Sequence, residues 1–200
     1  MSFLNFVACT DKLSNIQRFS QCFLAKNENV LEHTGQISLI SFYLAKEIES
    51  YGYDIDYYLL YAKSIFHDFD EIITGDIANP IKYHNDVLRA EISKLEHESI
   101  KNLEREFCCD WLYDIWSNAK SGPEGTIIGF CDVICALLKF HNEICNRGNK
   151  NMLYLMEFNL GIKLKNKIEQ LEKHFPLADS LFNSILQDCE LLIRQIKTVK

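Results

Sequence analysis

Apolar side chains recur at three- and four-residue intervals along most of the chain, which is the pattern of amphipathic helices. One such face runs through residues 33–50, where the apolar positions are Ile37, Ile40, Leu44 and Ile48. Gly52 lies just beyond this run, at a position where helices commonly end. The same pattern predicts further helices over residues 56–69, 84–105, 107–119, 125–147, 152–173 and 177–198.

Short polar or glycine-containing segments interrupt the helical pattern. Residues 72–80 include Gly75 and Pro80 and predict a loop or short turns. The segment SGPEG at residues 121–125 is the clearest internal break, and residues 147–149 form another. No run alternates with period two for long enough to build a sheet, and no repeat or linker is visible. The sequence therefore predicts a single all-α domain, a helical bundle spanning residues 1–200.

Composition and charge narrow the classes of function. The chain has 200 residues, of which 48% are hydrophobic and 24% charged, as in ordinary globular proteins. Its net charge is −7, so the chain does not carry the excess of basic residues that is typical of proteins that bind nucleic acid polymers. A phosphate-binding site in such a chain must be locally positive.

The chain also lacks the marks of export. No segment approaches 18 apolar residues, and the N-terminus has no basic region of the secretory type. The eight cysteines are scattered without a CxxC pair, which favours a reducing compartment. These features predict a cytoplasmic protein with no membrane partner.

Two histidines and two aspartates stand out as possible metal ligands. His33 precedes an apolar helical face, His67 and Asp68 are adjacent, and Asp132 interrupts a strongly apolar run. A mixed nitrogen and oxygen set of this kind suits a divalent cation with open positions for water and substrate. Such a site favours metal-assisted hydrolysis over a structural role.

Each of these residues also has an ordinary interpretation. A His-Asp dipeptide is common, and a single histidine such as His33 is more often a core or surface residue than a ligand. Asp132 is different, because an unpaired carboxylate within the apolar residues 127–140 is costly to bury. Glu71 follows His67 by four residues and Asp68 by three, so on a helix it would share their face.

Three segments carry a family resemblance. They are ENVLEH at residues 28–33, HDFDEIITGDIANPIKY at residues 67–83 and CDVICALLKF at residues 131–140. The order His, His-Asp, Asp resembles the HD-domain phosphohydrolases, and the flanking residues resemble the bacterial 5'-deoxynucleotidases of that superfamily and related small phage HD phosphohydrolases. The similarity runs from about residue 17 to about residue 149. It implies a helical bundle around one central metal ion, with the ligands His33, His67, Asp68 and Asp132.

The resemblance also implies roles for further residues. Glu71 matches a carboxylate that assists the attacking water, and Asp76 matches one that contacts substrate and takes part in catalysis. Arg18 and Phe19 stand where bacterial deoxynucleotidases carry Arg-Trp. A guanidinium suits phosphate because its planar fork donates paired hydrogen bonds. Phenylalanine keeps a flat wall against the sugar but lacks the indole N–H. Lys82 is predicted to add positive charge near the phosphate.

Three functions remain open from the sequence. The leading one is removal of the 5' phosphate from a 2'-deoxyribonucleoside monophosphate. The alternative is a triphosphohydrolase that cleaves a deoxynucleoside triphosphate, such as dATP, at the same sugar-side bond. The third is a non-catalytic nucleotide-binding module. Cobalt, manganese, zinc, iron and nickel all suit the ligand set, and the family implies a homodimer. The apolar positions available to an interface or to the core near the C-terminus are Leu181, Ile185, Leu192 and Ile196.

Overall fold

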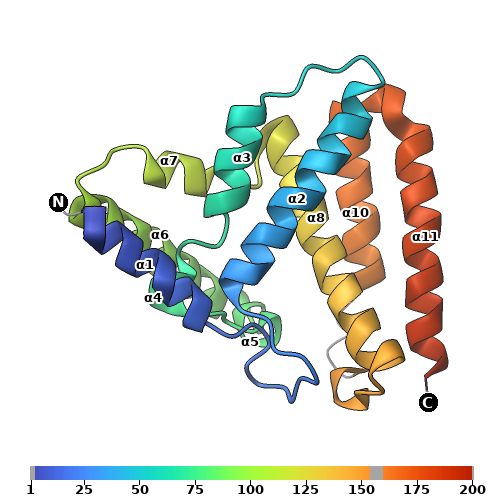
Figure 1. Ribbon diagram of the computed structural model, residues 1–200, viewed down its shortest axis with the longest axis horizontal. Coiled ribbons are helices and arrows are strands. Elements are labelled where there is room, and N and C mark those ends of the chain that lie inside the picture. The colour runs from blue at the N-terminus through green and yellow to red at the C-terminus, as the bar shows by residue number, and fades with distance from the viewer. Residues whose placement is uncertain (1–2, 154–159, 200) are drawn as a thin grey trace.

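Long helices running side by side dominate the structure, a computed structural model that describes residues 3–153 and 160–199. The bundle consists of α2 (Val30–Glu49), α8 (Gly122–His141), α10 (Leu160–His174) and α11 (Asp179–Thr198), with α3 (Tyr57–Phe66) packed against α2 and α8 (Figure 1). Within the described residues the regular elements are helical and no strand occurs. The predicted all-α class is confirmed.

The larger hydrophobic core lies inside this bundle. Its fully buried members include Ile37, Ile48, Ile127, Leu137, Leu171 and Phe182. Helix α8 is buried on several sides because it contacts α2, α3, α10 and α11. On α11, Ile196 is buried and the other three apolar positions pack partly buried against the same core. The apolar face of the C-terminal helix is therefore used within the chain.

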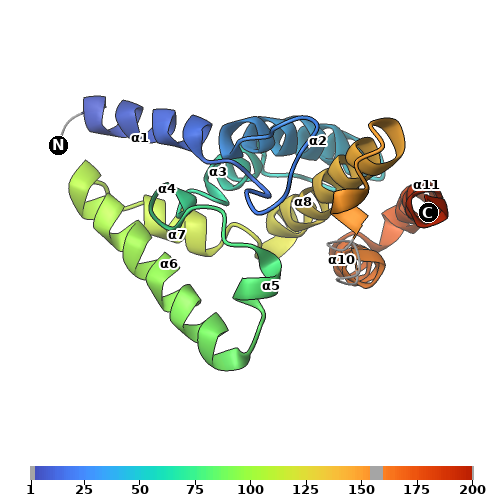
Figure 2. The same ribbon diagram turned by 90° about the horizontal axis from the view of Figure 1, so that it is seen from below.

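A smaller core lies beside the bundle, where α1 (Phe3–Asn15), α6 (Asp86–Phe107) and α7 (Leu112–Ser117) meet (Figures 1 and 2). The rings of Phe6, Phe69 and Phe107 pack together there, with centroids 5.4 to 6.5 Å apart. The sequence analysis did not predict α1. Its buried residues are Cys9 and Leu13, too few to make a clear apolar face.

Several helix ends differ from the predicted ranges. Helix α3 ends at Phe66, so His67 is its C-cap and Asp68 lies in the following turn, outside the helix expected over residues 56–69. Helix α8 begins at Gly122, earlier than predicted, because Gly122 takes a positive φ of 71° and Pro123 suits a first turn. Part of the helix expected over residues 152–173 lies at residues 154–159, outside the described residues.

Short helical turns connect the two cores. They are α4 (Glu71–Thr74) and α5 (Asn79–Lys82), in agreement with the predicted loop or short turns. After α8 the chain continues through a π-helical turn (Asn142–Asn146) and a 3-10 turn (Lys150–Met152), and a second 3-10 turn (Pro176–Ala178) precedes α11. None of the described helices combines the length and apolarity needed to cross a membrane.

Candidate functional site

Three elements of the bundle bring the predicted metal ligands together. Helix α2 begins with a capping box, in which the Asn29 side chain accepts from the Glu32 N–H and Glu32 accepts from the Asn29 N–H. This start fixes His33 in the first turn of α2. His67 and Asp68 follow the end of α3.

The fourth predicted ligand comes from α8, and the distances show how closely the set assembles. His33 Nε2 lies 3.6 Å from Asp68 Oδ2 and 3.3 Å from Asp132 Oδ1. His67 Nε2 lies 3.0 Å from Asp68 Oδ2. The potential ligand atoms of His33, His67 and Asp68 all lie within 4.8 Å of one another. Asp132 lies beside this group, and its Oδ2 accepts from Lys120 Nζ at 2.6 Å.

The histidine nitrogens fit a metal. His33 Nε2 and His67 Nε2 are both buried without a hydrogen-bond partner among the described residues. His67 Nδ1 donates to the Ser64 carbonyl over 2.8 Å, which leaves the lone pair on Nε2 facing the two aspartates. Histidines that bind metals are commonly oriented by such a bond from the other ring nitrogen. Buried nitrogens without partners, next to carboxylates, suit a divalent cation.

Both aspartates are held in the ionised form. Burial raises the pKa of Asp68, but His67 and Lys120 outweigh this effect and leave that pKa well below its usual range. The pKa of Asp132 is likewise lowered, because Lys120 and His33 overcome the cost of burial. Ionised carboxylates are the form that binds metal ions.

The two predicted catalytic carboxylates lie near this cluster in different environments. Glu71 begins α4, and its Oε2 is buried without a hydrogen-bond partner. Burial, together with the charges of Asp68 and Asp76, raises the pKa of Glu71 well above its usual range. Asp76 follows Gly75, whose φ is 68°, and its Oδ2 accepts from the Phe19 N–H at 2.9 Å. Glu71 thus has a buried oxygen without a hydrogen-bond partner among the described residues, whereas Asp76 is hydrogen-bonded to the backbone of the predicted substrate-binding residue Phe19.

A cavity of about 490 Å³ opens over these residues. Helices α5 and α10 lie on the same side of α8, opposite α2 (Figure 2). Residues of α5, α8 and α10 line the cavity. The predicted substrate and catalytic residues Arg18, Phe19, Lys82, Glu71 and Asp76 line it as well. Two of the predicted ligands, Asp68 and Asp132, are at its wall.

Arg18 and Phe19 meet the cavity in fixed orientations. Arg18 Nη1 lies 2.5 Å from Glu28 Oε1 and 2.8 Å from His33 Nδ1. Phe19 has a φ of 55°, unusual for a residue with a side chain, and its ring packs edge-on against Phe140 at 5.6 Å. Phe19 therefore serves both as a cavity wall and as part of the larger core.

Lys82 is already paired. Its Nζ donates to Glu96 Oε1 over 2.6 Å, so its charge is matched by a carboxylate before any phosphate arrives. A second cavity of about 230 Å³ adjoins this pair and also touches Asp68 and Glu71. His97 lines it, half-buried, with Nδ1 2.9 Å from the Tyr113 hydroxyl. Tyr113 and Trp116 of α7 pack against the His97 ring, at centroid distances of 5.7 and 5.0 Å.

The sequence analysis missed two cationic residues of the larger cavity. Lys163 and Lys167 reach it from α10, although that helix is far from the motif segments in sequence. Their spacing of four residues was visible, but nothing in the sequence showed which side of α10 would face the metal ligands. Lys120 was considered as a phosphate-facing charge. It lies at the wall of both cavities, paired with Asp132.

A buried carboxylate anchors the loop that carries Arg18 and Phe19. Glu143, which is fully buried, accepts from the N–H groups of Ala25 at 2.7 Å and Lys26 at 3.1 Å. It also accepts from Asn149 Nδ2 at 2.8 Å, and Asn149 in turn donates to the Phe23 carbonyl. The π-helical turn after α8 therefore holds the substrate loop in place.

Glu143→Gln is expected to loosen this loop. The amide offers one acceptor oxygen in place of two, so about 1–3 kcal/mol of stability should be lost through unsatisfied N–H groups. The KM for substrate should rise several-fold because Arg18 is less well placed. Thermal unfolding and steady-state kinetics measure both effects. Glu98→Gln, on the exposed side of α6, is the matched control, and equal behaviour of the two variants would contradict the anchoring role.

Comparison with known proteins then decides the family. Residues 5–187 match the family model described as "5'-deoxynucleotidase YfbR-like". The chain belongs to this family. Among YfbR-like relatives, the protein named 5'-deoxynucleotidase VV1113 of Vibrio vulnificus is 29% identical over 197 residues, covering 96% of this chain and 97% of its own. The protein named 5'-deoxynucleotidase plu3092 of Photorhabdus laumondii is 31% identical over 163 residues, covering 79% of each chain.

Solved structures agree on the fold of this YfbR-like chain. An HD-domain phosphohydrolase from Listeria innocua superimposes with a TM-score of 0.78 at 24% identity, covering 100% of this chain and 94% of its own. The protein PH0347 of Pyrococcus horikoshii gives a TM-score of 0.70 at 22% identity, covering 95% and 99%. The predicted helical bundle of the HD-domain type is confirmed, as is the predicted resemblance.

Proposed function

We propose that this protein is a divalent-metal-dependent hydrolase that converts 2'-deoxyribonucleoside 5'-monophosphates to deoxynucleosides and phosphate. The observation that carries the proposal is the cluster of His33, His67 and Asp68, in which both imidazole Nε2 atoms are buried without a hydrogen-bond partner among the described residues and Asp68 lines a cavity together with Arg18. Membership of the YfbR-like family supports it, as do the relatives named 5'-deoxynucleotidases.

The proposed metal ligands are His33, His67, Asp68 and Asp132. A divalent cation bound by them lowers the pKa of a water molecule and neutralises charge on the phosphoryl group. Asp132 would supply a carboxylate ligand, and its ion-pair partner Lys120 lines the same cavity, where a phosphate would accept a hydrogen bond from the ammonium group.

The remaining groups bind substrate and move protons. Arg18 donates to the phosphate oxygens, oriented by Glu28. Glu71 Oε2, in the ionised form, takes up a proton from the attacking water, and the raised pKa of this carboxyl makes it a stronger base than an ordinary glutamate. Asp76 contacts the substrate and fixes the backbone of Phe19. The proton that Glu71 takes from water is then passed to the departing O5' of the sugar, so the products are a neutral deoxynucleoside and phosphate.

We attribute a preference for deoxyribose to the wall made by Phe19. Its ring is fixed against Phe140, so it cannot easily move away from a 2'-hydroxyl. A hydroxyl facing this apolar surface would lose water without gaining a partner. A ribonucleotide is therefore disfavoured by the same side chain that packs against a deoxyribose.

Four finer points belong to the same proposal. The protein acts as one domain, as a homodimer and in the cytoplasm, with cobalt, manganese, zinc, iron or nickel at the centre. The apolar residues of α11 pack within the chain, so a dimer interface would use another surface. Nothing about the ligand set itself selects one metal.

The test is a screen of ribo- and deoxyribonucleoside monophosphates against each metal, with released phosphate and nucleoside measured. We expect deoxyribonucleotides to be hydrolysed and ribonucleotides to react at least about tenfold more slowly. Absence of phosphate release from every deoxyribonucleotide with every metal would refute the proposal. Stoichiometric binding without turnover would favour the non-catalytic module.

Arg18→Ala is expected to weaken substrate binding. Loss of charge-assisted hydrogen bonds to phosphate should raise KM by roughly 10–100-fold, with a smaller effect on kcat. Steady-state kinetics with a deoxyribonucleoside monophosphate measure this change. Arg105→Ala removes an exposed arginine of α6, whose Nη1 donates to Asn102 Oδ1, and serves as the control. Unchanged KM and kcat in Arg18→Ala would remove this residue from the phosphate site.

A further inference from the structure

Two lysines of α10 present their ammonium groups to the larger cavity. Lys163 and Lys167 lie four residues apart, on one face of the helix, and Asn166 and Gln170 line the cavity beside them. Lys165 lies on another face of α10, where its Nζ pairs with Glu190 of α11 at 3.4 Å. The cavity-facing lysines are thus distinct from the lysine that ties α10 to α11.

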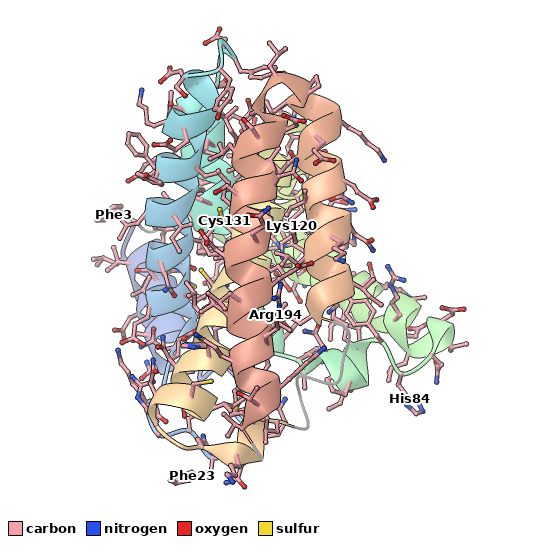
Figure 3. The ribbon with its side chains drawn as sticks, turned by 90° about the vertical axis from the view of Figure 1, so that its right-hand side faces the viewer. Phe3, Phe23, His84, Lys120, Cys131 and Arg194 are labelled. Atoms are coloured by element: carbon pink, nitrogen blue, oxygen red, sulfur yellow. The ribbon has the colours of Figure 1, made fainter. Side chains whose placement is uncertain are left out.

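Lys167 comes close to the metal ligands along α8. A Cβ atom placed on Gly129 would lie only 2.9 Å from Lys167 Nζ, so this ammonium rests directly against the glycine. Gly129 precedes Asp132 by three residues, or about 4.5 Å along the helix axis. A larger residue at Gly129 would push the Lys167 ammonium group aside. Figure 3 shows α10 and α11 in front, with Lys120 and Cys131 labelled at about the middle of their length.

The charges of these two lysines are not matched by carboxylates. Within the described part of the chain, neither Lys163 nor Lys167 forms an ion pair at 4.0 Å or less. Lys167 donates to Gln170 Oε1 over 3.2 Å, and Lys163 lies over the Tyr83 ring at 5.5 Å. The chain as a whole carries a net charge of −7. Unmatched ammonium groups facing a cavity in an acidic protein point to an anionic ligand.

Neighbouring positive charge strengthens this argument. Burial lowers the pKa of Lys167, and the charge of Lys120 lowers it further. The ammonium groups of Lys167 and Lys120 therefore repel each other across the cavity wall, and an anion between them would relieve that repulsion. Arg18 also lines the cavity, so one phosphate does not need all of these cations.

We propose that Lys163 and Lys167 form a second phosphate subsite, which holds the phosphates beyond the first in a deoxynucleoside diphosphate or triphosphate. The first phosphate lies at the metal ligands and Arg18, and the next ones lie along α10. This inference rests on the proposed function, because it places the nucleotide in the same cavity. It adds polyphosphate nucleotides to the ligands of that cavity.

The test compares the double variant Lys163→Ala/Lys167→Ala with Lys165→Ala as the matched control. Calorimetry with the metal-loaded protein, and metal kept in excess, gives the Kd of inorganic phosphate and of inorganic tripolyphosphate. Steady-state kinetics give the KM of a deoxynucleoside monophosphate and the inhibition constant of the matching triphosphate against it. Calorimetry reports binding even if turnover is absent.

We expect wild-type protein to bind tripolyphosphate at least about tenfold more tightly than phosphate. The double variant should lose about tenfold in affinity for tripolyphosphate and for the nucleoside triphosphate, with the Kd of phosphate and the KM of the monophosphate unchanged. Equal losses for phosphate and tripolyphosphate would overturn the subsite, as would an equal loss in Lys165→Ala. A wild-type protein with this binding preference but no monophosphate hydrolysis would refute the proposed function and leave the subsite standing.

Discussion

Replacing Asp68 with alanine is expected to abolish hydrolysis, with kcat falling by at least about 10³-fold. Asp68 is the residue that touches both halves of the cluster, because its Oδ2 lies 3.0 Å from His67 Nε2 and 3.6 Å from His33 Nε2. Its loss removes one of the two ionised ligands and leaves the two imidazoles and Asp132 to hold the cation. Metal content and phosphate release, measured on the same purified sample, should fall together.

The control for this variant is Asp188→Ala, which removes an exposed aspartate from α11. It should retain both metal and activity. Helical content, measured by circular dichroism, is expected to stay unchanged in both variants because Asp68 lies in a turn and not in a helix. Full activity in metal-loaded Asp68→Ala would show that the reaction does not use this cluster.

Glu71→Gln is expected to lose activity and gain stability. As a general acid-base group, Glu71 should contribute about 10²–10⁴-fold to kcat. Its buried carboxyl has a pKa raised by burial and by Asp68, so the folded, metal-free protein is destabilised when this group ionises. The folded state binds this proton more tightly than the unfolded state. Stability is therefore lost as the pH rises from the ordinary pKa of 4.5 towards the raised value.

Glutamine removes this loss because it cannot ionise. The variant should gain Tm over the wild type above that pH window and show no gain below it, where the wild-type carboxyl is protonated in both states. A gain of 1 kcal/mol would appear as about 2–4 °C in a protein of this size. Thermal unfolding of chelator-treated protein across pH tests the prediction. A Tm difference that does not change with pH would show that folding does not raise the pKa of Glu71.

Much of the fold could be predicted from hydrophobic spacing. The long amphipathic helices α2, α6 and α11 follow directly from apolar side chains at helical intervals. The ends of helices depend on local backbone conformation that spacing does not contain, such as the positive φ of Gly122 at the start of α8. Helix α1 was not predicted, because most of its surface remains exposed. Its position depends on the packing of a few buried residues, Cys9 and Leu13.

The candidate site likewise contains some residues that the sequence predicts and others that only the packed structure shows. The residues His33, His67, Asp68 and Asp132 are visible in the sequence because each stands in a recognisable motif. Lys167 and Glu143 stand in no motif. The position of Lys167 depends on how α10 packs against α8, and that of Glu143 on how the π-helical turn packs against a segment more than 100 residues away. Glu143, for instance, is separated from its partner Ala25 by 118 positions. Only the packed structure shows these pairings.

The separation between Ala25 and Glu143 affects the order in which parts of the enzyme fold during synthesis. A ribosome adds residues in order, so the loop behind Arg18 emerges long before the carboxylate that secures it. Contacts between such distant positions also form slowly, because closing a long loop costs conformational entropy. A nascent chain that ends before Glu143 would carry every proposed metal ligand and still lack the anchor for its substrate loop. The chain therefore becomes able to bind a nucleotide only late in translation.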